Sequence, residues 1–323
     1  MENFDLDLII KICNLKYIEK KQQKDIAKLL KLSPAKVTRM LQKAFDLGII
    51  KFNIADSNMG ITNLESEIEK KFKIKRMLVV KSNGENESET KTMIGQKISN
   101  YLLNILKDDD VLGISHSSTV AEVVKALPIK IPKKIKVVQL LGGSYNLSFE
   151  SLDLTKELSD KFEVFPSIIY APLFVNNKMI KKAILSDSSI KNTFNTIKNV
   201  NISLVGIGSF FPLGDSTIFK SGNLSQTEID ELIKAGAIGD IFGHFFDSSG
   251  HFCRTSIEDR IISIPVEYIG RIEYRIGAAS GIKKFDAIFA AIKGGLVNIL
   301  ATDEKVAELL LNAPFENSAG AYD

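Results

Sequence analysis

From residue 77 onward, short apolar runs alternate with amphipathic segments, and this alternation most limits what the chain can fold into. The runs at 137–141 and 202–207 are apolar on both faces, as strands buried in a parallel sheet are. We expect strands at 77–81, 111–115, 136–141, 164–170, 200–207, 260–264 and 297–302. We expect helices at 88–105, 118–127, 151–161, 225–235, 281–292 and 303–311. The pattern is typical of an α/β fold with a doubly wound, largely parallel sheet.

The composition is that of a globular protein of about two domains. The chain has 323 residues, 45% hydrophobic and 25% charged, and domains run to about 100–200 residues. Its two cysteines and three histidines lie at spacings that give neither a disulfide framework nor a zinc site. No apolar run reaches the ~18 residues of a membrane span, and the first ten residues carry acids where a secretory signal needs positive charge. We therefore expect a cytoplasmic protein with no metal, no cofactor and no membrane partner.

Positive charge is concentrated near the start of the chain. Residues 1–56 carry 11 Lys and Arg against 7 Asp and Glu, whereas the other 267 residues carry 31 against 32. Within this part, the stretch 31–43 holds four cations and no acid. A short basic stripe on a neutral body indicates a localised anionic partner such as DNA. A solvated helix face explains the charge equally well, so charge alone leaves both open.

Residues 1–56 have the pattern of three helices and a strand. Apolar spacing of three and four predicts helices over 6–17 and from about 22 to 32. A Ser-Pro pair, with Ser33 as N-cap and Pro34 at the first helical position, opens a third helix over 34–46. Gly48 is a suitable terminator, and the alternating stretch 49–54 predicts a strand. Together these predict a winged helix-turn-helix; the alternative is a small three-helix bundle with no role in DNA binding.

A helix-turn-helix docks its recognition helix in the major groove, so the outward residues of the third helix are the candidates for DNA contact. Arg39 can address guanine and Gln42 adenine. Lys36 and Lys43 suit phosphates, which position the protein without reading sequence. The full set of expected DNA-binding residues is Gln23, Ser33, Lys36, Thr38, Arg39, Gln42 and Lys43.

Residues 55–61 are small and polar and predict a linker, followed by a helix over 63–74. Beyond it, three Gly- or Ser-rich segments directly follow predicted strands, at 113–119, 142–144 and 206–209. Backbone N–H groups at a helix start form a phosphate cradle, because the helix dipole favours anions there. Tight turns of an α/β fold are the alternative explanation for each loop. The 206–211 stretch ends in Phe and has no suitable acid after it, so we reject a dinucleotide site.

The sequence resembles the SorC-type bacterial transcription regulators over nearly its whole length. The matching stretches are 23–27, 33–41, 44–54, 113–115, 137–143, 171–173, 204–209, 236–241, 245–247, 279–281 with Lys284, 287–288, 295–300 and 302–304. The family pattern differs at a few positions. Pro34 replaces an arginine, and Gly113-Ile114-Ser115-His116-Ser117 stands where the family has Gly-Ile-Ser-Trp-Gly.

The resemblance implies a DNA-binding domain at 1–56, and at 57–323 a linker and a sugar-phosphate effector domain whose fold resembles sugar-phosphate isomerases and deaminases. It implies that the phosphate is held by Ser115, Ser117, Thr119, Gly142, Gly143 and Ser144. Lys284 would add a positive charge, for which an exposed surface lysine is the alternative. Asp240 would bind sugar hydroxyls, and a turn or capping role is its alternative.

We therefore expect a transcription regulator whose operator DNA binding is controlled by a phosphorylated sugar. The resemblance implies a homo-oligomer, a dimer or, as is usual in the family, a tetramer. Two alternatives remain. One is a sugar-phosphate isomerase or deaminase with an appended DNA-binding head, although no convincing acid/base pair stands out. The other is a regulator that has lost its ligand, which the altered 115–118 loop suggests.

Overall fold

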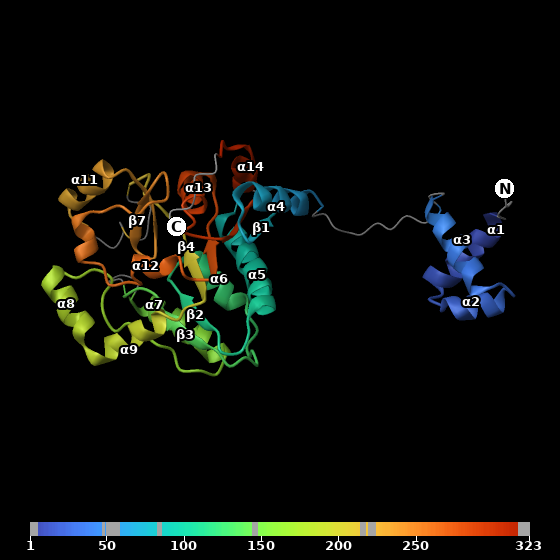
Figure 1. The fold of residues 1–323 in the computed structure, drawn as a ribbon, viewed down its shortest axis with the longest axis horizontal. Helices are drawn as coiled ribbons and strands as arrows, with labels where there is room; N and C mark the ends of the chain where they lie inside the picture. The colour runs from blue at the N-terminus through green and yellow to red at the C-terminus, as the bar shows by residue number, and fades with distance from the viewer. Residues whose placement is uncertain are drawn as a thin grey trace. The chain divides into compact units, whose positions relative to one another are not determined.

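The computed structural model describes residues 6–46, 49, 59–82, 86–143, 148–213, 218 and 224–315. The chain divides into two compact units, Met1–Asn58 and Met59–Asp323 (Figure 1). Helix α4 (Met59–Phe72) begins inside the stretch expected to be a linker, four residues before the predicted helix start at Asn63. Residues 50–58 lie outside the described part, so the expected domain boundary at residue 56 stays a prediction.

The first unit contains three helices around one small core. Helix α1 (Leu6–Cys13) continues into a π-helical stretch, Asn14–Ile18, and is followed by α2 (Gln23–Leu29) and α3 (Pro34–Asp46). Buried side chains from all three pack together; they are Ile9, Ile12, Cys13, Leu15, Ile26, Ala27, Val37, Met40, Leu41 and Ala44. Lys31 has φ of 54° in the tight α2–α3 turn, and the Ser33 Oγ accepts a hydrogen bond from the Lys36 N–H at 3.2 Å. The expected Gly48 terminator lies outside the described residues, as does the 49–54 strand except for Ile49.

The second unit is built on a six-stranded sheet in which every neighbouring pair is parallel. In space the strand order is β1-β9-β8-β4-β2-β3. The strands are β1 (Arg76–Val80), β2 (Val111–Ile114), β3 (Lys136–Gln139), β4 (Ile202–Gly206), β8 (Tyr274–Ala278) and β9 (Ile299–Asp303). The expected α/β fold with a largely parallel sheet is confirmed.

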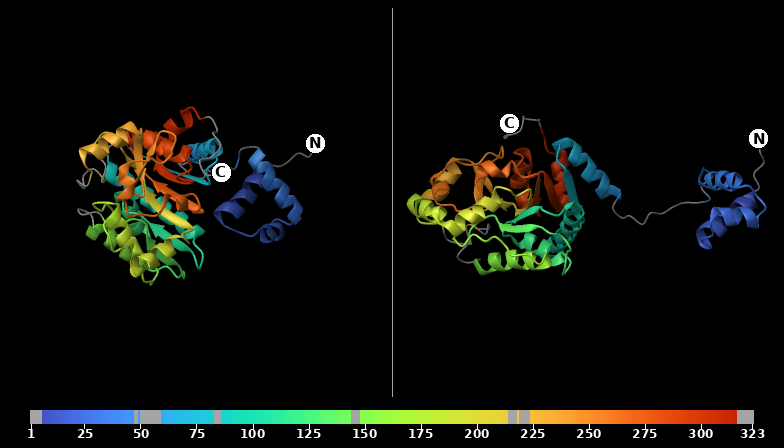
Figure 2. Two further views of the ribbon diagram at one scale, coloured as in Figure 1. Left: turned by 60° about the vertical axis from the view of Figure 1, so that its left-hand side comes forward. Right: turned by 60° about the horizontal axis from the view of Figure 1, so that its bottom comes forward.

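Helices cover both faces of this sheet (Figure 2). Helices α5 (Glu87–Ile105), α6 (Ser118–Ala126) and α7 (Ser148–Lys161) pack on one face, whereas α4, α13 (Phe285–Lys293) and α14 (Glu304–Asn312) pack on the other. Successive strand residues feed the two cores alternately: Leu78 belongs to one and Val79 to the other. Because both faces are buried, most residues of these strands are apolar.

A smaller layer adjoins the sheet. It contains the antiparallel strands β5 (Gly208–Ser209), β6 (Ala237–Ile241) and β7 (His244–Asp247). It also contains helices α8 (Lys178–Ser186), α9 (Ser188–Ile197), α11 (Gln226–Lys234) and α12 (Val266–Ile269). The sequence pattern did not predict β5, β6, β7, β8, α8, α9 or α12. None of the helices in the described ranges is long and apolar enough to cross a membrane.

Two predicted strands are wrong. Segments 164–170 and 260–264 form only isolated bridges, such as Ser167 with Val138 and Ser263 with Leu141. Ile261, Ile262 and Ile264 are nevertheless fully buried. The apolar pattern of 260–264 therefore reflected burial in the core, not pairing in the sheet.

Side chains and a loop close both edges of the large sheet. At β1, the Glu69 Oε1 accepts the Met77 N–H at 2.8 Å, and the Glu65 Oε1 accepts the Val79 N–H at 2.7 Å. Both glutamates come from α4. At β3, the backbone of Ser167 exchanges hydrogen bonds of 2.9 Å with Val137 and Gln139. The outward backbone groups at these positions are therefore satisfied within the chain.

Candidate functional site

The strand order creates a switch point between β2 and β4. The chain runs from β2 outward to the edge strand β3, then returns to the other side of β2 as β4, and continues outward through β8 and β9. Loops leave β2 and β4 in opposite directions at such a point, so a crevice opens beyond their carboxyl ends. In open α/β sheets ligands bind in this crevice.

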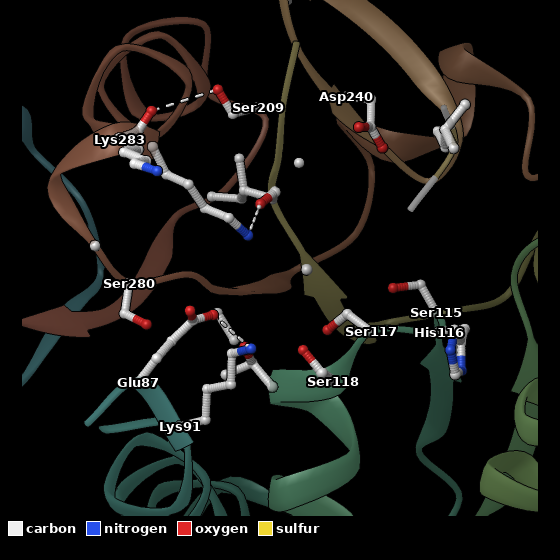
Figure 3. Close-up of a pocket in the computed structure, with 18 of the residues that line it drawn as sticks. Glu87, Lys91, Ser115, His116, Ser117, Ser118, Ser209, Asp240, Ser280 and Lys283 are labelled. Atoms are coloured by element: carbon white, nitrogen blue, oxygen red, sulfur yellow. Dashed lines mark hydrogen bonds and ion pairs between the residues drawn. The ribbon is translucent and has the colours of Figure 1, made fainter. Parts of the chain in front are cut away.

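A cavity of about 690 Å³ lies there, which we call the strand-end cavity (Figure 3). Its volume is within the range of small-molecule sites, about 300–1,000 Å³. Residues at or after the carboxyl ends of all six strands line it. They are Ser82 after β1, Ser115–Thr119 after β2, Leu141 and Gly142 after β3, Gly206–Ser209 at and after β4, Ala278 and Ser280–Lys284 at and after β8, and Asp303 at the end of β9.

Most of the expected effector-binding residues lie in the wall of this cavity. They are Ser115, Ser117, Thr119, Gly142, Asp240 and Lys284. Gly143 is not among the lining residues: its N–H donates to the Ala171 carbonyl at 2.9 Å and its carbonyl accepts the Leu173 N–H at 2.7 Å. Ser144 lies outside the described residues.

The loop after β2 presents the start of helix α6 to the cavity. The Ser117 Oγ accepts the Val120 N–H at 3.1 Å, so this hydroxyl caps the helix. Figure 3 shows Ser117 and Ser118 at the end of the helix that faces the cavity. Ser115 and Thr119 are buried beside them. The remaining N–H groups of the first turn and the helix dipole favour an anion at this point.

Glycines let the loop after β4 approach its neighbours closely. A Cβ atom on Gly206 would lie 2.5 Å from the Ser117 Cβ, and one on Gly208 would collide with the Asp240 carboxylate. Gly208 and Asp240 are paired across the small sheet. Glycine therefore brings the Asp240 carboxylate and the start of α6 up to the cavity wall, which a larger residue would prevent.

Asp240 and Lys284 are residues of the cavity wall whose pKa values are shifted by burial. Burial raises the pKa of the Asp240 carboxyl to about 6, against the opposing influence of Lys284 and His244. Burial likewise lowers the pKa of the Lys284 ammonium, which the nearby Asp240 charge partly offsets. The Lys284 Nζ donates to the Ile207 carbonyl at 3.1 Å. Ionisable groups held at such cost in a cavity are typical of functional sites.

The cavity also holds charged residues that the sequence interpretation missed. Lys91 and Glu87, on the first turns of α5, form an ion pair at 2.7 Å, and Lys283 and Lys305 lie in the wall as well. Asp303 accepts the Gly281 N–H at 2.7 Å and the Val306 N–H at 3.1 Å. Asp303 directly follows a predicted strand and was therefore detectable, whereas nothing in the sequence marked the α5 pair.

The described residues contain no group of three or more His, Cys, Asp or Glu side chains placed to hold a metal ion. What the cavity brings together is a helix start, ammonium groups and a carboxylate. Such a set of groups can hold an anionic group at one end and hydroxyls at the other.

In the first unit, the expected DNA-contacting residues lie on α2, α3 and the turn between them. Ser33, Lys36, Thr38, Arg39 and Gln42 are exposed, and Lys43 and Gln23 are half-buried. The Thr38 hydroxyl lies 3.3 Å from the Gln23 Oε1 and 3.1 Å from the Pro34 carbonyl, and it can donate to either. The side opposite to these residues carries Val37, Met40 and Leu41 into the core, so α3 presents a polar outer face.

Comparison with known proteins now identifies the family. Residues 56–312 match the family described as "Putative sugar-binding domain". The deoxyribonucleoside regulator of Bacillus subtilis is 27% identical over 314 residues, which cover 97% of this chain and 99% of that protein. The sorbitol operon regulator of Klebsiella pneumoniae is 28% identical over 317 residues, covering 96% and 100%. The crystal structure of full-length SorC from Klebsiella pneumoniae matches with a TM-score of 0.75 at 27% identity, over 96% of this chain and 100% of that one. The chain therefore belongs to the SorC-type transcriptional regulators and carries their sugar-binding domain.

Proposed function

We propose that this protein binds operator DNA through its first unit and that a phosphorylated sugar in the strand-end cavity sets its affinity for that DNA. The observation that carries the proposal is the cavity itself, where a helix start, Lys284 and Asp240 line one space at the switch point of the sheet. Relatives are named for sorbitol, erythritol and deoxyribonucleosides. A sugar or polyol derivative fits both the chemistry of the wall and these names.

In the proposed complex the phosphate lies against the first turn of α6. Ser115, Ser118 and Thr119 line this end, and the Ser117 Oγ keeps its capping bond. Lys284 supplies a point charge, as lysine commonly does for phosphate. Asp240 accepts hydrogen bonds from sugar hydroxyls, and Gly142 leaves room for the ligand. Gly143 acts only through its structural backbone bonds.

The first unit acts as a winged helix-turn-helix in the cytoplasm. Helix α3 enters the major groove, where Arg39 and Gln42 address base edges and Lys36 and Lys43 meet phosphates. Ser33, Thr38 and Gln23 flank this face. A homo-oligomer, dimer or tetramer, would present two such helices to half-sites about one helical turn apart or a multiple of it.

The effector changes DNA affinity only if it binds the DNA-competent and the incompetent arrangement with different strength. Coupling between two such sites is typically about 1–3 kcal/mol, equivalent to about 5–150-fold in affinity, and it is reciprocal. The factor by which the effector changes DNA affinity must therefore equal the factor by which DNA changes effector affinity. That reciprocity separates real control from nonspecific effects of an anion on DNA binding.

The test begins with selection of preferred DNA from random duplexes by the full chain. Fluorescence anisotropy of the selected duplex then measures affinity with and without each member of a sugar-phosphate panel. We expect one or a few members to change the affinity at least fivefold. The Lys284→Gln variant should keep DNA affinity and lose the effect of the sugar phosphate. The Arg39→Ala variant should lose sequence preference and keep ligand binding.

Failure of the full chain to select any duplex would contradict the DNA-binding half of the proposal. If no sugar phosphate raised the melting temperature, the sensing half would be wrong, because a ligand of the native state stabilises it by mass action. The alternative of an isomerase or deaminase is tested on the same samples. NMR spectra of the effector incubated with the protein should show no conversion.

A further inference from the structure

A second cavity, of about 340 Å³, lies between the α8–α9 pair and the segment 258–267. We call it the α8–α9 cavity. It shares no lining residue with the strand-end cavity. The two are neighbours all the same: Phe242 and Gly243 line the first, and His244 lines the second. Its volume is at the lower end of the range for small-molecule sites, about 300–1,000 Å³.

Three lysines converge on this cavity from the two helices. Lys181 comes from α8 and Lys191 from α9, and Lys198 is the C-cap residue that directly follows α9. Positions 191, 195 and 198 are four and three residues apart, so Lys191, Asn195 and Lys198 share one face of α9. The Lys198 Nζ donates to the Asn195 Oδ1 at 3.3 Å. The Lys181 Nζ donates to the Glu258 carbonyl at 2.7 Å, and burial lowers the pKa of its ammonium.

Two glutamates, Glu258 and Glu267, also line the cavity, and Glu258 contacts His244. The His244 Nδ1 lies 3.0 and 3.2 Å from the two carboxyl oxygens of Glu258. The His244 Nε2 lies 2.9 Å from the Ile264 carbonyl, which can only accept, so Nε2 carries a hydrogen. The His244 ring thus bridges the Glu258 carboxylate and the Ile264 carbonyl.

Among the described lining residues, three lysines stand against two glutamates, Glu258 and Glu267, an excess of one positive charge. Apolar side chains complete the wall; they are Leu185, Phe194, Ile261, Ile262, Pro265 and Val266. An excess of ammonium groups over a partly apolar floor suits a small dianion with a carbon skeleton. Phosphate esters carry about two negative charges near neutral pH.

We propose that the α8–α9 cavity is a second anion site that binds a small phosphate-bearing metabolite through Lys181, Lys191 and Lys198. The Asn195 amide donates to a phosphate oxygen, and Phe194 and Leu185 contact the carbon skeleton. Glu267, at the rim, opposes binding through its negative charge. This site does not depend on the proposed function of the strand-end cavity, because no residue is common to both.

The test uses inorganic pyrophosphate as the probe and isothermal titration calorimetry of the full chain. We expect two classes of site in the unaltered protein. The Lys191→Gln/Lys198→Gln variant should lose one class, with affinity reduced at least tenfold. The Lys284→Gln variant should keep that class and weaken the other. A matched control is Lys156→Gln/Lys182→Gln, which removes two exposed lysines that line neither cavity and should leave both classes unchanged.

A gain of affinity provides a check that misfolding cannot imitate. The Glu267→Gln variant removes the opposing charge and should tighten the Lys191-dependent class threefold or more. The proposal is overturned if the Lys191→Gln/Lys198→Gln variant binds pyrophosphate within twofold of the unaltered protein. It is also overturned if Glu267→Gln leaves that affinity unchanged, or if small phosphate esters fail to displace pyrophosphate from the class.

Discussion

The two cavities of the second unit are built by different means. The strand-end cavity is made by backbone: glycines that allow close approach, a capped helix start and the carboxyl ends of six parallel strands. The α8–α9 cavity is lined by side chains of two helices and of the segment 258–267, away from the strand ends. α8 has no fully buried residue. We infer that the first cavity is rigid and fixed by the topology, whereas the second tolerates change in its backbone and depends on its charges.

The largest effect is expected from a substitution that adds a side chain where the backbone of the strand-end cavity leaves no space for one. A Cβ on Gly142 would lie 2.7 Å from the carbonyl oxygens of both Ala171 and Pro172. Because backbone atoms cannot rotate away, we expect Gly142→Ala to lower the free energy of unfolding by about 3 kcal/mol. It should also abolish stabilisation by the effector. Chemical denaturation of the full chain measures both.

Gly60→Ala is the matched control, since nothing lies within 4 Å of a Cβ there, on the exposed surface of α4. This change should raise stability by about 0.5–1 kcal/mol, because alanine favours a helix. Equal responses of the two variants would contradict a rigid frame around Gly142.

The next effect concerns the charge of Asp240. With a pKa of about 6 in the folded chain against the ordinary 3.8, this carboxyl binds its proton more tightly in the folded state. The negative charge of Asp240 therefore lowers the free energy of unfolding. This destabilisation is absent below pH 4, grows as the pH rises from 4 to 6 and is complete above the pKa of the folded state. Asp240→Asn should raise the free energy of unfolding by about 3 kcal/mol at pH 8 and by much less at pH 4.

The same substitution should weaken effector binding, because an amide is a poorer acceptor for sugar hydroxyls than a carboxylate. Denaturation curves at the two pH values, together with effector titrations, measure this opposition of stability and function. A stability gain that is equal at pH 4 and pH 8 would show that burial of the charge is not its cause.

The smallest effect is expected from the helix N-caps beside the two cavities. Ser117 caps α6 at the strand-end cavity, and Asn177 caps α8 beside the other cavity, each by accepting one backbone N–H. Removing either cap with alanine should cost about 1 kcal/mol of stability. Only Ser117→Ala should also weaken the effector, and only Asn177→Ala should weaken the Lys191-dependent binding of pyrophosphate. Thermal unfolding with each ligand separates the two, and exchanged or shared effects would mean that the cavities are not independent.

The same contrast explains how much the sequence could predict. Five of the six large-sheet strands were predicted, because strands buried on both faces are apolar. β8 was missed because it opens with Tyr274 and Arg275 and contains Gly277. The Arg275 guanidinium donates to the carbonyls of Ile272 and Gly270 at 2.6 and 3.2 Å, so a polar residue is satisfied within a central strand.

The strand-end residues were predictable because parallel strands end at one edge of a sheet, which brings Ser115, Gly206 and Asp303 together although they lie far apart in the chain. The same reasoning included Gly143, whose backbone is instead committed to the 171–173 segment. Glu87 and Lys91 depend on how α5 packs, and the α8–α9 cavity depends on two helices absent from the predicted pattern. The packing of helices leaves no local signal of this kind.

The closed edges of the sheet limit how copies of this chain can assemble. Unprotected edge strands invite pairing with a strand from a second molecule, and proteins avoid this by covering them. Here Glu69 accepts a hydrogen bond from the Met77 N–H and Glu65 accepts one from the Val79 N–H at one edge of the sheet. The Ser167 segment covers the other edge. At these positions the large sheet is closed to a strand from a second copy, so copies of this chain that meet on it join through its covering helices and loops rather than as one continuous sheet.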